Sequence, residues 1–183
     1  MEKLTIDSTI YSSKPIEGSR LEKEMKTYRL LEQLGISYLR VDHEPADTIE
    51  DCKEIEAILG VKIYKNLFLC NRQKTQFYLL VMPGDKKFVT KEVSKQIGSS
   101  RLSFGNAQHM EKYLNTTPGS ASILGLMNDK EHKVHLLLDR QVTESEYFGC
   151  HPCINTSSLK IQTKDILEKF LRYTGHQPCI IEL

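Results

Sequence analysis

The sequence predicts one α+β domain in which helices pack around a mixed β-sheet. The chain has 183 residues, of which 39% are hydrophobic and 27% charged, as in a globular domain large enough to bury a core. Strand-like apolar runs and amphipathic helical patterns follow one another without regular alternation, which excludes a doubly wound parallel sheet. We expect the domain to span residues 19–183. Residues 1–18 contain turn-forming serine, proline and glycine and predict a flexible arm with a short ordered piece.

The first predicted helix begins near Ser19. Ser19 and Glu22 have the spacing of a capping box, and Gly35 is a typical left-handed helix end. A strand is predicted for residues 36–42, directly after that glycine. The apolar positions between cap and glycine recur at helical intervals and are Leu21, Met25, Tyr28, Leu31 and Leu34.

A second helix and a β-hairpin come next. Thr48 and Asp51 predict a capped helix start, and Gly60 predicts the end of that helix. Two apolar, β-rich runs then follow at residues 65–71 and 76–82, joined by four polar residues. This pattern is typical of two antiparallel strands.

The second half of the chain predicts shorter elements. Thr90 can cap a short helix, and another helix is expected at residues 106–114. Small and turn-forming side chains predict a loop at residues 116–125. Further strands are expected at residues 132–138, 147–149, 157–161 and 179–183, and a further helix at residues 163–173.

The composition predicts a cytoplasmic protein. The longest apolar runs are far shorter than the roughly 20 residues that cross a bilayer, and the first residues contain no apolar stretch typical of a signal peptide. Five cysteines are an odd number, which favours reduced thiols rather than a disulfide framework. We therefore expect no membrane association and reduced cysteines.

Positive charge is concentrated in one segment. The whole chain carries a net charge of +1, but residues 62–101 contain nine basic and two acidic residues, a local charge of +7. The remainder therefore carries −6. A basic segment in a neutral chain fits a protein that touches a polyanion on one face only, although charge alone also fits a solvated lysine-rich surface.

The pattern Cys150-His151-Pro152-Cys153 is the most conspicuous local motif. A structural zinc site needs four ligands, and no second cysteine pair or histidine pair lies at usable spacing, so we expect no metal. A redox pair would begin a helix, whereas a strand is expected after residue 156. Two ordinary thiols beside a turn are the preferred interpretation, and His151 could orient a water molecule or a substrate carbonyl.

Other catalytic patterns are absent from the sequence. It contains no GxSxG, GxxxxGK[ST], HExxH or GxGxxG motif. His132 and His135 fall in a predicted strand three residues apart, so they should point to opposite faces. The remaining histidines are expected at the surface or in turns, namely His43, His109 and His176.

Lys65 and the loop at residues 117–122 are two further candidates. Lys65 opens an apolar strand, where a lysine can be partly desolvated beside a cleft, although lysines also flank core strands as gatekeepers. The loop consists of small residues whose backbone can approach a ligand and whose N–H groups can hold an oxyanion. An ordinary loop is the alternative interpretation.

Six separated motifs together resemble the YbaK-like family of aminoacyl-tRNA editing domains, and most closely its free-standing PrdX-type (ProXp-ala) branch. The resemblance covers about residues 20–183. The motifs are KNLFL at 65–69, SRLSF at 100–104, TPGS at 117–120, GLMNDK at 125–130, GCHP at 149–152 and TGH at 174–176.

The resemblance implies a barrel-like mixed sheet surrounded by helices and an enzyme without a cofactor. That enzyme would hydrolyse alanine mischarged onto proline tRNA in trans, by water attack assisted by the 2′-hydroxyl of the terminal adenosine. Such a second sieve is needed because a proline pocket excludes the smaller alanine by only about 1–3 kcal/mol. The expected partners are aminoacyl-tRNA and prolyl-tRNA synthetase, with the protein itself a monomer or weak homodimer.

The resemblance also implies site residues. The catalytic set is Lys65, Gly119 and His151. The substrate-binding set is Asn66, Ser120, Ala121, Ser122, Asn155 and Thr156, and the tRNA-binding set is Lys62, Lys91, Lys95 and Arg101.

The sequence departs from the family pattern at three positions near the expected pocket. Ile123 replaces the usual proline, Leu124 stands where phenylalanine is common, and Cys153 replaces a more usual asparagine or other residue. These changes make the amino-acid specificity less secure than the reaction.

Two alternative functions stay open. The same chemistry could act on another misacylated tRNA, with cysteine as the main alternative. A catalytically inactive module that binds tRNA or a synthetase is the other, but such a module would have no need to keep Lys65, Gly119 and His151 together.

Overall fold

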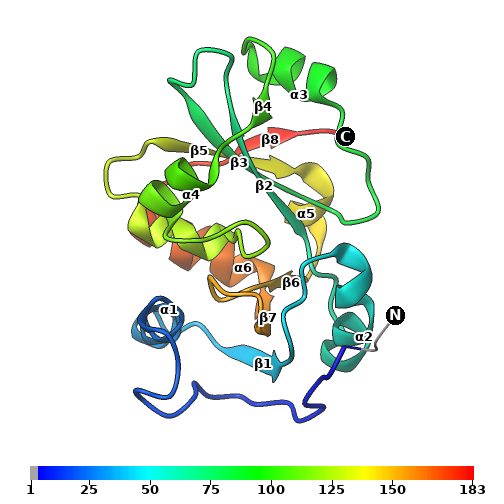
Figure 1. Ribbon diagram of the computed structural model, residues 1–183, viewed down its shortest axis with the longest axis vertical. Helices are drawn as coiled ribbons and strands as arrows, with labels where there is room; N and C mark the ends of the chain where they lie inside the picture. Colours follow the sequence, from blue (N-terminus) through cyan, green and yellow to red (C-terminus); the bar gives the residue numbers. More distant parts are fainter. Residues whose placement is uncertain (1–3) are drawn as a thin grey trace.

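The computed structural model describes residues 4–183 and contains two β-sheets with helices packed around them (Figure 1). The smaller sheet is antiparallel, in the order β1 (Tyr38–Asp42), β7 (Ser157–Gln162) and β6 (Tyr147–Cys150). The larger sheet has the order β4 (Ser103–Phe104), β2 (Lys65–Cys70), β3 (Phe77–Met82), β5 (Val134–Asp139) and β8 (Cys179–Ile181). The predicted α+β class with a mixed sheet is confirmed, but the strands form two separate sheets rather than one barrel-like sheet.

The larger sheet combines antiparallel and parallel pairing. The predicted hairpin is confirmed, because β2 pairs antiparallel with β3 from Lys65 opposite Met82 onward. On the other side of β3, β5 and then β8 are added in parallel. Every residue of β3 is buried, since alternate side chains enter two different hydrophobic clusters on the two faces of the sheet.

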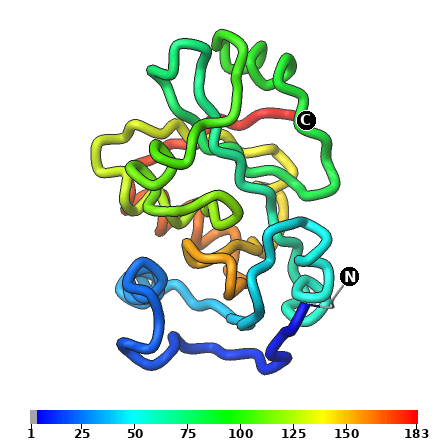
Figure 2. Tube along the Cα trace, viewed as in Figure 1, coloured from blue at the N-terminus to red at the C-terminus, as the bar shows by residue number. Residues whose placement is uncertain are grey.

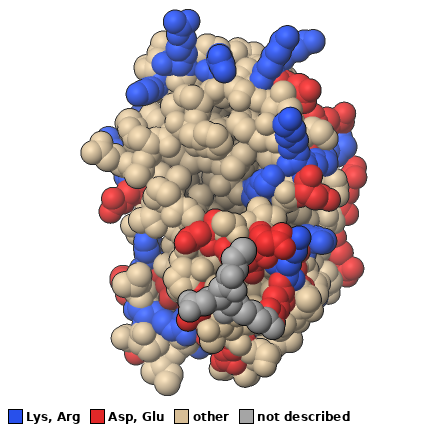
Figure 3. Space-filling view, turned by 45° about the vertical axis from the view of Figure 1, so that its right-hand side comes forward, with Lys and Arg blue, Asp and Glu red and all other residues tan. Residues whose placement is uncertain are grey.

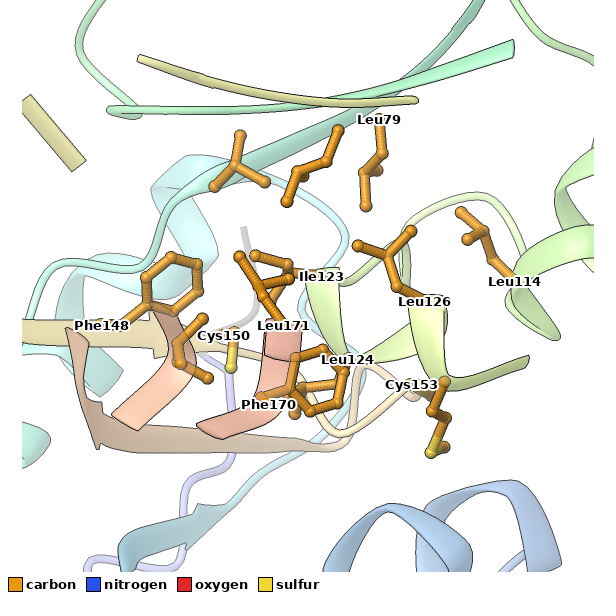
Figure 4. Close-up of a cluster of buried hydrophobic side chains, with 14 of the residues drawn as sticks. Leu79, Leu114, Ile123, Leu124, Leu126, Phe148, Cys150, Cys153, Phe170 and Leu171 are labelled. Atoms are coloured by element: carbon orange, nitrogen blue, oxygen red, sulfur yellow. The ribbon is translucent and has the colours of Figure 1, made fainter. Parts of the chain in front are cut away.

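The main hydrophobic core lies between the two sheets. Figure 4 shows Leu79 of β3 facing side chains of η1, a 3₁₀ helix (Ile123–Asn128), with Phe148 of β6 and Phe170 nearby. Ile123 and Leu124 are completely buried in this core. Burying side chains of this size contributes about 1.5–3 kcal/mol each, so the core joins the two sheets into one domain.

Helices lie around the two sheets and also fill the space between them (Figure 1). In the described residues 4–183 no helix is both long and apolar enough to cross a membrane. The final three helical segments follow one another without a break, with a π-helical turn in the middle, where the sequence predicted one helix. The helices are α1 (Glu22–Gln33), α2 (Ile49–Leu59), α3 (Thr90–Ile97), α4 (Ala107–Leu114), α5 (Arg140–Glu144), α6 (Thr163–Asp165), η2 (Ile166–Phe170) and α7 (Leu171–Thr174).

One of the predicted helix caps is confirmed, because Thr48 and Asp51 form the capping box of α2. A cap that was not predicted lies at the start of α4, where the Asn106 side chain accepts a hydrogen bond from the backbone N–H of His109. The other two predicted caps are wrong. The Ser19 hydroxyl donates to the carbonyl of Ile16 instead, so that Leu21 precedes α1, while Thr90 is already the first residue of α3.

The segment before α1, predicted as a flexible arm, runs along the edge of β1 from residue 5 to residue 11 (Figure 2). Backbone hydrogen bonds of 2.7–2.9 Å join Asp7 to Asp42 and Tyr11 to Arg40. The Arg40 guanidinium lies over the Tyr11 ring at 4.4 Å. This segment therefore covers an edge strand that would otherwise expose unpaired backbone groups.

Candidate active site

Several of the predicted site residues line one cavity of about 330 Å³. It lies between the start of α2, the start of β2, the loop that contains Gly119, and the segment after β6. Lys65, Gly119 and His151, the three predicted catalytic residues, all line it. The other lining residues are Ala46, Asp47, Thr48, Ile49, Cys52, Ile63, Tyr64, Asn66, Leu67 and Ala121.

Lys65 is the first residue of β2 and is half-buried. Its ammonium group donates a 2.9 Å hydrogen bond to the backbone carbonyl of Lys86, in the segment that follows β3. That segment is itself anchored, because the Lys86 side chain pairs with the fully buried carboxylate of Asp139 at 2.9 Å. Within residues 4–183 no carboxylate lies within 4.0 Å of the Lys65 ammonium, so its charge is free to attract an anion.

Asn66 stands beside Lys65 on the same strand. Its side-chain amide donates to the backbone carbonyl of Tyr64 at 3.1 Å, while its side-chain oxygen is buried without a hydrogen-bond partner. A buried acceptor without a donor costs about 1–3 kcal/mol. Unpaired polar atoms of this kind are typical of sites built for function rather than for stability.

His151 is buried in the segment that joins β6 to β7. Its Nδ1 lies 2.9 Å from the backbone carbonyl of Ser157. Because a carbonyl can only accept, Nδ1 carries the proton and Nε2 is left as the acceptor. Burial lowers the pKa of His151 to about 4, so that the ring is neutral at physiological pH.

His43 is a second buried histidine close to His151. Their ring centroids are 6.1 Å apart, and the Ser158 hydroxyl lies between them, 2.9 Å from His43 Nε2 and 3.2 Å from His151 Nδ1. His43 Nδ1 donates to the carbonyl of Glu44, so that its Nε2 accepts from Ser158. Burial lowers the pKa of His43 as well. The prediction of a surface or turn position for His43 is wrong, because the pairing of β1 with β7 carries its ring inward.

Gly119 has a backbone conformation that favours glycine, with a φ of +87°. A Cβ at this position would lie 2.9 Å from the carboxylate of Asp47, which leaves no room for a side chain. The loop is held by the Ser120 hydroxyl, which lies 3.1 Å from the backbone nitrogen of Thr117 and accepts its N–H. The backbone of Gly119 can therefore approach a ligand in the cavity directly.

Asp47 and the apolar walls of the cavity were not predicted from the sequence. Asp47 accepts a hydrogen bond from the side-chain amide of Asn155, more than a hundred positions away in the chain. Cys52 is buried in the wall, and burial raises the pKa of its thiol to about 11. The three-residue spacing of Thr48 and Asp51 predicts the cap of α2 from the sequence. No comparable local pattern distinguishes Asp47 from an ordinary surface carboxylate.

Four of the predicted substrate-binding residues do not line this cavity. Ser120, Asn155 and Thr156 line a neighbouring pocket of about 500 Å³ together with Arg20 and Lys23. Ser122 is fully buried, and its hydroxyl caps the start of η1. Ile123 and Leu124, which the sequence placed near the pocket wall, lie in the core and line neither space.

The predicted tRNA-binding residues lie outside the cavity on the surface. Lys91 and Lys95 project from α3, and Arg101 precedes β4. Lys62 lies just before β2, 3.5 Å from Glu56. Figure 3 shows a hollowed face with Lys and Arg side chains along its upper edge and Asp and Glu side chains gathered below the hollow.

The two cysteines beside His151 are completely buried. Burial raises the pKa of both thiols, that of Cys153 to about 11. Among the described residues no group of three or more His, Cys, Asp and Glu side chains could hold a metal ion. Both thiols are protonated at neutral pH and therefore poor nucleophiles.

A separate pair of histidines lies near the end of α7. His176 is buried and its Nε2 lies 3.0 Å from the carboxylate of Asp129, so of the predicted surface or turn position the surface part is wrong. His132 precedes β5 in a left-handed turn, so it is not in the strand with His135 as predicted. The prediction failed because the Asp129 carboxylate accepts the backbone N–H groups of Lys133 and Val134 and delays the start of the strand.

Comparison with known proteins identifies the family. The sequence model of the protein family described as the aminoacyl-tRNA editing domain matches residues 43–169. This range includes every residue that lines the cavity. The chain belongs to the aminoacyl-tRNA editing domain family. The predicted family and the predicted class, an aminoacyl-tRNA editing enzyme, are thereby confirmed.

Individual relatives extend over most of the chain. It is 33% identical over 153 residues to the prolyl-tRNA editing protein ProX of Acetoanaerobium sticklandii, which covers 84% of this chain and 93% of that protein. It is 30% identical over 169 residues to prolyl-tRNA synthetase associated domain-containing protein 1 of Mus musculus. That match covers 90% of this chain and 97% of the mouse protein. A solved structure of a candidate trans-editing enzyme for prolyl tRNA synthetase has a TM-score of 0.66 at 16% identity and covers 90% of this chain and 99% of that one, which shows a shared fold.

Proposed function

We propose that this editing domain acts in trans on tRNA(Pro) and hydrolyses the ester bond of mischarged alanine. The observation that carries the proposal is the cavity in which Lys65, Gly119 and His151 meet, although they come from three distant segments. The relatives named above edit prolyl-tRNA or carry a domain associated with prolyl-tRNA synthetase. These names support tRNA(Pro) as the substrate.

Water is the attacking nucleophile in this proposal. The Cys52 thiol is protonated at neutral pH, and the Thr48 hydroxyl is used in the capping box of α2, so neither is an activated nucleophile. An aminoacyl ester is already activated and needs no covalent intermediate. Positioning of water and carbonyl is therefore sufficient, and the 2′-hydroxyl of the terminal adenosine assists the attack.

His151 and the Gly119 loop divide the positioning between them. The free Nε2 of His151 accepts a hydrogen bond from the attacking water or from the 2′-hydroxyl, and its low pKa keeps that lone pair available. Gly119 and Ala121 line the cavity through a loop without bulky side chains. Their backbone N–H groups stabilise the oxyanion that forms on the carbonyl oxygen.

Lys65 and the surface lysines attract the tRNA. The Lys65 ammonium, which has no carboxylate partner within residues 4–183, binds the phosphate of the 3′-terminal nucleotide, beside Asn66. Lys62, Lys91, Lys95 and Arg101 are exposed and supply positive charge for the acceptor stem. Binding should therefore weaken as the salt concentration rises.

The apolar walls of the cavity select a small amino acid. Ile49, Cys52, Ile63 and Leu67 narrow the space next to the polar residues. Refusal of the larger, rigid proline ring completes the second sieve that the synthetase needs. Cysteine is close to alanine in size, so removal of cysteine is the second candidate function.

The decisive experiment is single-turnover hydrolysis of Ala-tRNA(Pro), Cys-tRNA(Pro) and Pro-tRNA(Pro), each measured against its uncatalysed decay. Rapid loss of alanine with proline spared is the expected result. Faster hydrolysis of Cys-tRNA(Pro) would support the same ester hydrolysis, with cysteine rather than alanine as the amino acid removed. No acceleration with any substrate would leave a module that only binds tRNA.

The variant Lys65→Ala belongs in the same experiment. Loss of the phosphate contact should slow alanine removal at least about tenfold. Lys112→Ala is the matched control, because it removes the same charge from the exposed surface of α4, outside the cavity and outside the proposed tRNA-binding residues. Equal losses of activity in the two variants would show that Lys65 contributes only to the long-range electrostatic attraction of the tRNA, without a specific phosphate contact.

A further inference from the structure

Two opposite charges line the cavity without neutralising each other. Among residues 4–183, Lys65 and Asp47 are the only lysine, arginine, aspartate or glutamate residues in its lining. The Lys65 ammonium is bound to a backbone carbonyl rather than to Asp47. In the part of the chain from residue 4 to residue 183, no lysine, arginine or histidine nitrogen lies within 4.0 Å of the Asp47 carboxylate.

Asp47 is held in place by its neighbours on two sides. Its carboxylate accepts from the side chain of Asn155, and the backbone N–H of the preceding Ala46 donates to the carbonyl of Asn155 at 3.0 Å. On the other side, Thr48 begins the capping box of α2. The segment around Asp47 is therefore fixed to the segment that carries His151.

The Asp47 carboxylate also lies against the loop proposed to bind the ester. One of its oxygens is 2.9 Å from the position that a Cβ of Gly119 would occupy. The carboxylate is consequently next to the loop backbone in the cavity, rather than at a remote edge. A cation placed close to an ester carbonyl held by this loop would meet Asp47.

We propose that Asp47 binds the α-ammonium group of the aminoacyl ester. This inference rests on the proposed function, since it concerns the substrate of the same cavity. An aminoacylated tRNA end carries one cation, the α-ammonium group, two bonds from the reacting carbonyl carbon. It also carries the anionic phosphate of the terminal nucleotide. Asp47 and Lys65 match this arrangement of charges with one partner each.

The consequence is selection for a free amino group. An ester of the same size without the cation would leave Asp47 without its partner and lose that contact. Lactyl-tRNA(Pro) is such an ester, because a hydroxyl replaces the amino group of alanine. The protein should therefore hydrolyse Ala-tRNA(Pro) in preference to lactyl-tRNA(Pro), even though their side chains are identical.

The experiment compares these two substrates at subsaturating protein, each rate divided by the uncatalysed rate of the same ester. The wild-type protein should favour the alanyl ester about tenfold. Asp47→Asn keeps the size and the contact with Asn155 but removes the charge. It should slow hydrolysis of the alanyl ester about tenfold and leave the lactyl ester unchanged, which abolishes the preference.

Glu50→Gln is the matched control. Glu50 lies three residues after Asp47, pairs with Lys53 and is absent from the cavity lining. It should leave both rates unchanged, and thermal unfolding of each variant verifies that the fold is retained. The proposal would be overturned if the wild-type protein accelerated the hydrolysis of both esters equally over their uncatalysed rates. It would also be overturned if Asp47→Asn lost the same fraction of that acceleration on both esters.

The same experiment distinguishes the failure of this inference from the failure of the proposed function. If the wild-type protein accelerates neither ester, the deacylase function itself is wrong. If it hydrolyses the alanyl ester without preference, the deacylase function stands and the role of Asp47 is wrong.

Discussion

The molecule contains two pairs of neighbouring histidines whose surroundings differ in one respect. The rings of His43 and His151 are surrounded by carbonyls and the Ser158 hydroxyl, with no carboxylate in hydrogen-bond contact. In the other pair, His176 contacts the buried carboxylate of Asp129 at 3.0 Å, and the His132 ring lies 4.7 Å away. Hydrogen-bond partners, rather than residue type, therefore decide what each histidine can do.

In the first pair the neutral ring of His151 lines the cavity, while the second pair joins two parts of the chain. The Asp129 carboxylate binds the backbone just before β5 and, through His176, the segment after α7. Burial alone would raise the pKa of Asp129, but hydrogen bonds from His176 and from the backbone of Val134 and Lys133 outweigh it and lower the pKa. From this difference we expect the first pair to act in the reaction and the second to stabilise the fold, and each expectation can be tested.

The largest effect is expected for His151→Asn. Asparagine can still donate to the Ser157 carbonyl, but it removes the Nε2 acceptor from the cavity. Single-turnover hydrolysis of Ala-tRNA(Pro) should fall about 100-fold. His43→Asn is the control at the other ring and should slow the reaction far less. Similar losses in both variants would mean that the pair acts as one structural unit.

The second test is Asp129→Asn in the other pair. The amide replaces a carboxylate that receives three hydrogen bonds, so at least one donor loses its acceptor. The free energy of unfolding in urea should fall by about 2–4 kcal/mol. Turnover by the folded variant should stay near the wild-type rate, and a large loss of turnover with normal stability would contradict the division of roles.

A third, smaller difference is expected in the pH dependence of stability. Burial lowers the pKa of His43 and His151, the latter to about 4, so the unfolded chain gains protons first as the pH falls. The contribution of the two neutral histidines to the free energy of unfolding is complete above about pH 6.5 and is lost as the pH falls toward 4. The lowered pKa of Asp129 places its contribution above about pH 3.9, lost only in stronger acid.

Urea unfolding between pH 7 and pH 4 checks this difference. Stability should decline over that range in the wild-type protein, and the decline should be shallower in His151→Asn. The decline should persist in Asp129→Asn, starting from a lower stability. An unchanged slope in His151→Asn would show that the ring does not titrate in this window.

The smallest effect is expected from chelation. Neither histidine pair, nor any other group in the described part of the chain, offers three ligands to a metal ion. Protein treated with EDTA, then freed of it and assayed with magnesium for the tRNA, should hydrolyse Ala-tRNA(Pro) at its original rate. A loss that zinc restores would contradict this expectation.

Local patterns in the sequence determined much of the secondary structure. The capping box of α2, the hairpin of β2 and β3, and the glycines that end α1 and α2 depend on residues within a few positions of one another. The same is true of the motifs that led to the family. The failed caps at Ser19 and Thr90 show the limit of this local information, since Ser19 found a competing partner.

Tertiary structure alone decided which of these residues meet. Lys65, Gly119 and His151 could be named from motifs, but Asp47 became a candidate only because the segment carrying Asn155 packs beside it. In the same way, the sequence could not reveal that His43 and His176 are buried or that Ile123 lies in the core. Burial and charge pairing depend on contacts between distant segments, whereas local patterns record only how each segment folds by itself.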